Sequence, residues 1–112
     1  EVMNYPNPFS TSTRFVFTLT GSVLPDEMLI QIMNISGRVV REITADELGQ
    51  LRIGRNITDF AWDGRDNYGD LLANGVYLYR VTARSGGQEI KHLESGADPY
   101  FHKGLGKLYI LR

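Results

Sequence analysis

Apolar and polar residues alternate along most of this chain, which is the pattern of half-buried β-strands. From Arg14 to Thr20, for example, Phe15, Phe17 and Leu19 share one side of the backbone. The run from Gly75 to Ala83 has apolar residues on both sides, which is typical of a central strand. The alternation predicts strands at 14–20, 28–33, 38–43, 58–62, 75–83 and 107–111.

Turn-forming residues separate these runs. The segment 34–37 (Asn-Ile-Ser-Gly) predicts a hairpin between the second and third strands. The segment 60–70 holds the only tryptophan and a dense group of Asp, Asn and Gly, so we expect it to connect two strands. Residues 44–49 predict one short helical turn, with Thr44 or Asp46 as its cap and Gly49 at its end.

Short strands without a sustained helical period predict an all-β fold, an antiparallel β-sandwich of about seven strands in one domain spanning 1–112. Pro6 and Pro8 favour an extended edge segment at 4–9, where Tyr5 and Phe9 would plug the end of the core. The residues expected to form the core are Phe15, Phe17, Ile30, Ile32, Trp62, Tyr77 and Tyr79. The residues expected to shape the turns are Asp63, Gly64, Asp66 and Gly75.

Composition excludes several functions. With 12 basic and 13 acidic residues the net charge is −1, so a general basic footprint for nucleic acid is missing. The sequence has no cysteine, which excludes disulfides, a thiolate nucleophile and cysteine-type zinc sites. No apolar run approaches the roughly 18 residues that span a bilayer. Because the chain starts at Glu1 without an initiator methionine, we expect it to be a piece of a larger protein.

The candidate metal-binding and catalytic residues also fit ordinary structural roles. Four aspartates (Asp59, Asp63, Asp66 and Asp70) are possible calcium ligands, but their spacing misses the regular calcium loop and suits a polar turn. His92 and His102 lack a third ligand, and Ser36 and Ser95 lack the surroundings of a nucleophile. The segment 104–107 is too short for a phosphate-binding loop. We therefore expect no catalytic residue, no metal and no cofactor.

The long connection 88–106 is the expected place for contacts with a partner, since long loops in compact domains are often functional. Its Tyr100 and Phe101 are either exposed anchors or buried against the sandwich. Arg38, Arg41, Arg52 and Arg55 form either a basic patch or a solvated face.

Five motifs together resemble a known family. They are Asn4–Phe9, Gly37–Val40, Trp62–Asp66, Asn74–Arg80 and Gly106–Arg112. In this order they resemble the immunoglobulin-like (Ig-like) C-terminal domains of proteins exported by the type IX secretion system of Bacteroidota, which are similar to the Ig-like domain of the flagellar hook-capping protein. The insertion 88–106, with 49–57 and 101–107, is most similar to the C-terminal domain of the type IX sorting peptidase, a gingipain-like cysteine endopeptidase.

This resemblance implies a non-catalytic domain at the outer-membrane surface, or outside the cell, that serves export, docking or partner recognition. Its partners would be type IX outer-membrane components or other surface proteins, and the peptidase's catalytic residues would lie in a preceding domain. The residues expected to contact a partner are Tyr100, Phe101, His102, Lys103, Lys107, Tyr109 and Arg112. We also expect the terminal strand to offer a free edge for a partner strand. Two alternatives are a cleavable sorting signal of an exported adhesin or hydrolase, and a structural module of flagellar hook-cap type.

Overall fold

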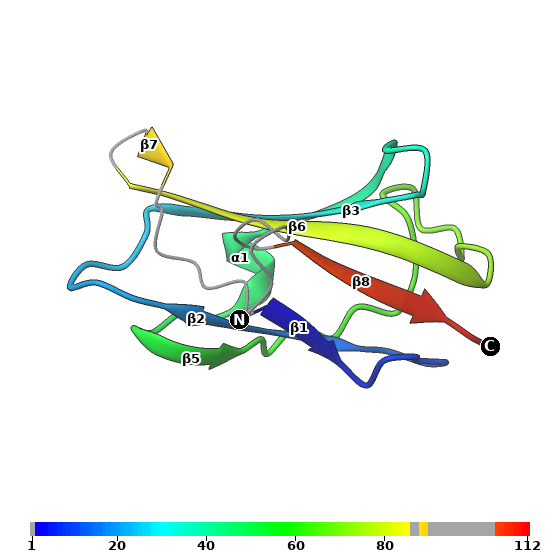
Figure 1. Ribbon diagram of the computed structural model, residues 1–112, viewed down its shortest axis with the longest axis horizontal. Helices are drawn as coiled ribbons and strands as arrows, with labels where there is room; N and C mark the ends of the chain where they lie inside the picture. Colours follow the sequence, from blue (N-terminus) through cyan, green and yellow to red (C-terminus); the bar gives the residue numbers. More distant parts are fainter. Residues whose placement is uncertain (1, 86–87, 90–104) are drawn as a thin grey trace.

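Two antiparallel sheets face each other across one hydrophobic core (Figure 1). The computed structural model describes residues 2–85, 88–89 and 105–112. The smaller sheet has the order β1 (Val2–Tyr5), β2 (Arg14–Leu19) and β5 (Gly54–Ile57). The larger sheet contains β3 (Glu27–Met33), β4 (Val39–Thr44), β6 (Gly75–Ser85), β7 (Gln88–Glu89) and β8 (Leu105–Ile110). This architecture confirms the predicted all-β, Ig-like sandwich.

Strand β6 is the centre of the larger sheet. It pairs with β3 along one edge, and on its other edge with β8 through Gly75–Arg80 and with β7 through Arg84–Ser85. Its inward residues are buried, while Leu78 and Arg80 on the opposite face are exposed. Strand β4 pairs with β3 on the far side through the predicted hairpin, in which Asn34 Oδ1 accepts the amides of Ser36 and Arg38.

The core is built from inward-facing residues of both sheets, as the alternation requires. Phe15 and Tyr79 come from opposite sheets, and their rings meet edge to face with centroids 5.1 Å apart. The residues predicted for the core are all buried: Phe15, Phe17, Ile30, Ile32, Trp62, Tyr77 and Tyr79. The rest of the apolar core comprises Phe9, Leu19, Met28, Ile43, Leu48, Val81, Ala83, Leu108 and Ile110.

The short helix α1 (Ala45–Leu48) begins and ends near the predicted residues. Thr44 is its N-cap, and Gly49 ends it with a φ of 93° that suits glycine. The Thr44 amide donates to the Glu47 carboxylate over 3.3 Å, and Leu48 is buried in the core.

The strand predicted at 58–62 is wrong, because the strand lies at Gly54–Ile57 instead. The Thr58 hydroxyl ends the ladder: it accepts the Phe15 amide over 3.1 Å and donates to the Phe60 carbonyl over 2.8 Å. Pairing with the β2 side resumes only at an isolated bridge between Thr13 and Trp62. Thr58, Phe60 and Trp62 therefore follow a bent connection rather than a strand.

The prediction that Tyr5 plugs the core is also wrong. Tyr5 lies on the outer face of β1 and is 74% exposed, whereas Phe9 is buried against Trp62 with ring centroids 5.7 Å apart. The strand itself lies at 2–5, and the two proline residues follow it with cis peptide bonds at Tyr5–Pro6 and Asn7–Pro8.

Candidate functional site

The turn segment 62–72 is held by its own side chains. Trp62 is fully buried and donates its ring N–H to the Arg65 carbonyl over 2.9 Å. The Asp66 carboxylate accepts the amides of Tyr68 and Asp70 at 2.9 and 3.0 Å. The aspartate is therefore engaged by the turn, which is the structural alternative to binding calcium.

The other candidate calcium ligands are dispersed. Asp63 forms an ion pair with Arg65 over 3.2 Å, and Asp59 lies beside Gly49 at the end of α1. Within the described ranges, no three His, Asp or Glu side chains gather closely enough to hold a metal ion.

Arg112, expected to contact a partner, binds this same turn segment. Its guanidinium donates to the carbonyls of Leu72, Asp63 and Gly64, and the last of these distances is 3.1 Å. Gly64 has a φ of 79°, and a Cβ there would lie 2.3 Å from the Arg112 guanidinium. Asn74 then pairs its side-chain amide with the main chain of Arg112 in both directions. These contacts fasten the C-terminal strand to the turn.

The edge of β8, expected to be free, is closed by residues 7–9. The Asn7 side chain donates to the Lys107 carbonyl over 2.9 Å and accepts the Tyr109 amide over 3.0 Å. Phe9 continues the pairing, because its amide donates to the Tyr109 carbonyl and its carbonyl accepts the Leu111 amide. A partner strand cannot pair with β8 unless it first displaces this segment.

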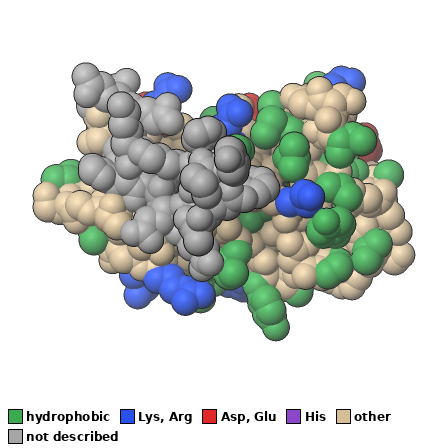
Figure 2. Space-filling model, viewed as in Figure 1, with side chains coloured by type: hydrophobic (Ala, Val, Ile, Leu, Met, Phe, Trp, Pro, Cys, Tyr) green, Lys and Arg blue, Asp and Glu red, His purple; other side chains and the backbone are tan. Residues whose placement is uncertain are grey.

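The side chains of Lys107 and Tyr109 nevertheless remain exposed on the outer face of the larger sheet. On this face Tyr109 of β8 lies opposite Val76 of β6. Two residues along β6, Leu78 lies between Lys107 of β8 and Met33 of β3. Figure 2 shows hydrophobic side chains gathered on the right of this view, over the part of the molecule that carries β8 in Figure 1. The other predicted contacts, Tyr100, Phe101, His102 and Lys103, lie outside the described residues, as do His92 and Ser95.

The four arginines considered as a basic patch divide into two groups. Arg41 forms an ion pair with Glu47 over 2.7 Å and stacks on the Phe60 ring, with its guanidinium carbon 5.7 Å from the centroid. The hydrogen bond that Arg41 donates to Glu47 lowers the pKa of the Glu47 carboxyl. Arg38 lines a groove beside the turn segment, together with Val39, Asn67 and Tyr68.

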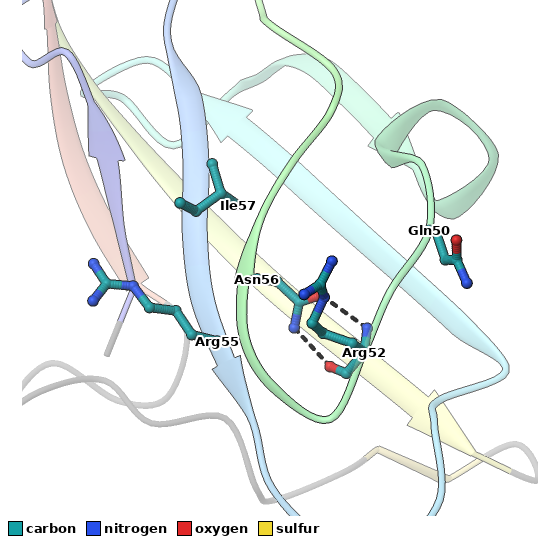
Figure 3. A pocket seen from close by; sticks show the side chains of 5 residues that line it. All are labelled: Gln50, Arg52, Arg55, Asn56 and Ile57. Atoms are coloured by element: carbon teal, nitrogen blue, oxygen red, sulfur yellow. Dashed lines mark hydrogen bonds between the residues drawn. The ribbon is translucent and has the colours of Figure 1, made fainter.

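Arg52 and Arg55, in contrast, both lie at β5, with their side chains on opposite sides of the strand (Figure 3). They line a shallow pocket with Gln50, Asn56 and Ile57 (Figure 3). The buried Asn56 side chain holds the preceding loop, since it accepts the Arg52 amide and donates to the Arg52 carbonyl at 2.9 and 2.8 Å. We call Gln50, Arg52, Arg55 and Ile57 the β5 edge site. Sequence reasoning missed Ile57 and Gln50, although an exposed isoleucine between polar residues on a short strand is a usable signal.

Residues 7–87, well over half of the chain, match the model of the FlgD Ig-like domain. The chain belongs to this family. It is also 37% identical over 65 residues to the basal-body rod modification protein FlgD of Salmonella typhimurium (strain LT2) and to that of Salmonella typhi. Each match covers 58% of this chain and 26% of the relative, so the chain spans about a quarter of the length of these curated relatives.

Membership of the FlgD Ig-like family overturns the assignment to type IX secretion. The expected source in Bacteroidota, the type IX partners and the location at the outer-membrane surface were wrong for the same reason. The motifs misled because they serve the sandwich itself: Asn7 closes an edge, Trp62 fills the core, and Asn74 holds the C-terminal strand. Motifs that serve the sandwich itself cannot distinguish two families that share this fold.

Neither the family description nor the name of the relatives is that of an enzyme, which agrees with a non-catalytic domain. In the described part of the chain no helix is long and apolar enough to cross a membrane.

Proposed function

We propose that this chain is a structural Ig-like module of a flagellar protein of the basal-body rod modification type. The observation that carries the proposal is the family match over residues 7–87, supported by the 37% identity to the two Salmonella proteins. Of the functions considered from the sequence, the flagellar hook-cap module is the one that these matches favour.

The architecture supports a role in binding proteins. Hydrogen bonds from Asn7 hold the edge of β8, and hydrogen bonds from Arg112 hold the turn segment 62–72. The outer faces of the sandwich are therefore preorganised for binding. Exposed apolar side chains, such as Ile57 at 61% and Tyr68 at 90%, offer contact area on this frame. We infer that the module acts by holding neighbouring proteins of the flagellum in place.

The test is a deletion in the organism that encodes the chain. The segment for residues 2–112 is removed from the full-length gene, and swimming is measured in soft agar while flagella are counted by electron microscopy. An immunoblot checks that the shortened protein is still produced. We expect cells without complete flagella, whereas normal swimming with normal flagella would overturn the proposal.

A further inference from the structure

The outer edge of β5 is open. The Thr58 amide donates to the Phe15 carbonyl over 3.0 Å, and hydrogen-bonded pairs alternate along an antiparallel ladder. Since Phe17 is opposite Asn56, the backbone groups of Asn56 point toward β2. Those of Arg55 and Ile57 therefore point away from the sheet. Among the described residues, no hydrogen-bond partner occurs for these outward amides and carbonyls.

Two edges of the larger sheet are covered by other parts of the chain. Residues 7–9 close β8, and Asn67 closes β4 by donating to the Val40 carbonyl and accepting the Glu42 amide, both over 3.0 Å. Strand β1 lies beside β8 and leads directly into Pro6, which lacks an amide donor. Strand β5 is only four residues long and carries Arg55, and short length and charge both protect an edge from indiscriminate pairing. The same two features leave its outward groups available to a short segment of opposite charge.

The charge at this edge has one sign. The three strands of the smaller sheet, all within the described part of the chain, carry Arg14 and Arg55 and no Asp or Glu. Arg52 adds a second guanidinium at the β5 edge site, and in the described ranges neither Arg52 nor Arg55 forms an ion pair. Ile57 provides an apolar neighbour on the same face as Arg55, two residues further along the strand.

We propose that β5 accepts an extended segment of a partner protein as an added strand, with a carboxylate opposite Arg55 and an aliphatic side chain opposite Ile57. For antiparallel addition the partner segment reads aliphatic–any residue–acidic from its N-terminal to its C-terminal end. The proposal names the partner chemistry for the module proposed above and rests on that function. A second copy of this chain does not fit, because β5 carries no carboxylate that could lie opposite Arg55.

The first experiment uses two synthetic peptides of extended character and the isotope-labelled 112-residue chain. One peptide repeats Val-Thr-Glu-Thr, so that Val and Glu lie two residues apart on the same face, and its control has Lys in place of each Glu. Binding is followed by NMR chemical shifts and amide exchange. We expect the Glu peptide to shift and protect the amides of Arg55 and Ile57, and the Lys peptide to leave them unchanged. Equal binding of both peptides, or shifts confined to β4 or β8, would overturn the proposal.

Two variants separate the charge from the backbone pairing. Arg55→Glu should weaken binding of the Glu peptide about tenfold, since it replaces attraction with repulsion. Ile57→Pro removes the outward amide but no hydrogen bond to β2, so it should abolish binding in a chain that still melts cooperatively. If Ile57→Pro does not fold, Arg55→Glu alone decides, and unchanged binding by it refutes the proposal. Dimerisation of the chain through β5 would refute it as well.

This test is independent of the flagellar one. If the deletion abolishes flagella while no peptide binds β5, the module is flagellar and this partner chemistry is wrong. If the peptide binds as predicted while the deletion strain swims normally, the proposal for β5 is supported and the flagellar function is refuted.

Discussion

At Gly106, the residue type is constrained by the side chain opposite it in the sheet. It is paired with Tyr79, and a Cβ at this position would lie 2.2 Å from the tyrosine ring. Glycine is needed here because the ring of Tyr79 covers the strand, not because the segment 104–107 binds phosphate. Burial also raises the pKa of the Tyr79 hydroxyl, which keeps that side chain neutral.

Gly106→Ala should therefore destabilise the fold by about 1–3 kcal/mol, the usual cost of overpacking a core. Thermal and urea unfolding measure this loss. Lys107→Ala, at the next and exposed position of β8, is the matched control and should change stability little. Equal stability of the Gly106 variant and the wild type would show that the Tyr79 ring is not fixed over this strand.

The ion pair of Glu47 with Arg41 predicts a dependence of stability on pH. The hydrogen bond from Arg41 lowers the carboxyl pKa below its ordinary value of 4.5 in the folded state. A lowered pKa stabilises the fold above the unfolded value, and this contribution is lost as the pH falls through the folded value. Glu47→Gln should melt at a slightly lower temperature than the wild type at pH 7, and the difference should shrink below pH 4.5. A difference that does not change with pH would assign the effect to packing.

At the scale of the strands, asparagine side chains extend or close the sheets. Asn7 and Asn67 each supply hydrogen bonds that a neighbouring strand would otherwise make, at β8 and β4 respectively. Asn74 holds the main chain of Arg112 in the same way. Asparagine side chains thus help to close the edges of β8 and β4 and to hold the C-terminal end.

Asn7→Ala should cost about 1 kcal/mol, since it removes two partly solvated hydrogen bonds to β8. Hydrogen exchange at the Tyr109 amide should accelerate. Asn7→Asp keeps the acceptor for Tyr109 and loses the donor to Lys107, so its Tyr109 amide should stay more protected than in the alanine variant. Unchanged exchange in both variants would show that this edge is closed by Phe9 alone.

Much of the sandwich was predictable because its strands have a period of two. Phe15, Phe17, Ile30 and Ile32 reveal their buried faces by position alone. The strand at Gly54–Ile57 was not predictable, because its one buried residue is polar. Asn56 occupies the inward position where an alternating pattern would show an apolar residue. Thr58, Phe60 and Trp62 share a parity, but the Thr58 hydroxyl bends the chain between them.

The candidate site was less predictable than the fold. Arg112 looked like an accessible cation at the end of a strand, and only the fold shows that its guanidinium reaches three carbonyls 40 to 49 residues away in sequence. The open edge of β5 likewise depends on which neighbours the other strands find. Edges are properties of the assembled sheet, so no local pattern reports them.

At the scale of the whole molecule, the chain is an Ig-like sandwich of the FlgD family, for which we propose a role in binding other proteins of the flagellum. Three exposed apolar residues lie on three different parts of the surface and can serve as positions for probes. Ile57 lies at the β5 edge site, Leu78 on the outer face of the larger sheet, and Ile35 in the β3–β4 hairpin, with exposed fractions of 61%, 36% and 77%. Each can be replaced without disturbing the core.

The most direct test places a photo-crosslinking amino acid at each of these three positions in the full-length protein, in living cells, and identifies the adducts by mass spectrometry. We predict adducts with proteins of the flagellum, and the highest yield at position 57. Adducts formed only with proteins outside the flagellum, or no adduct at any of the three positions, would contradict the account.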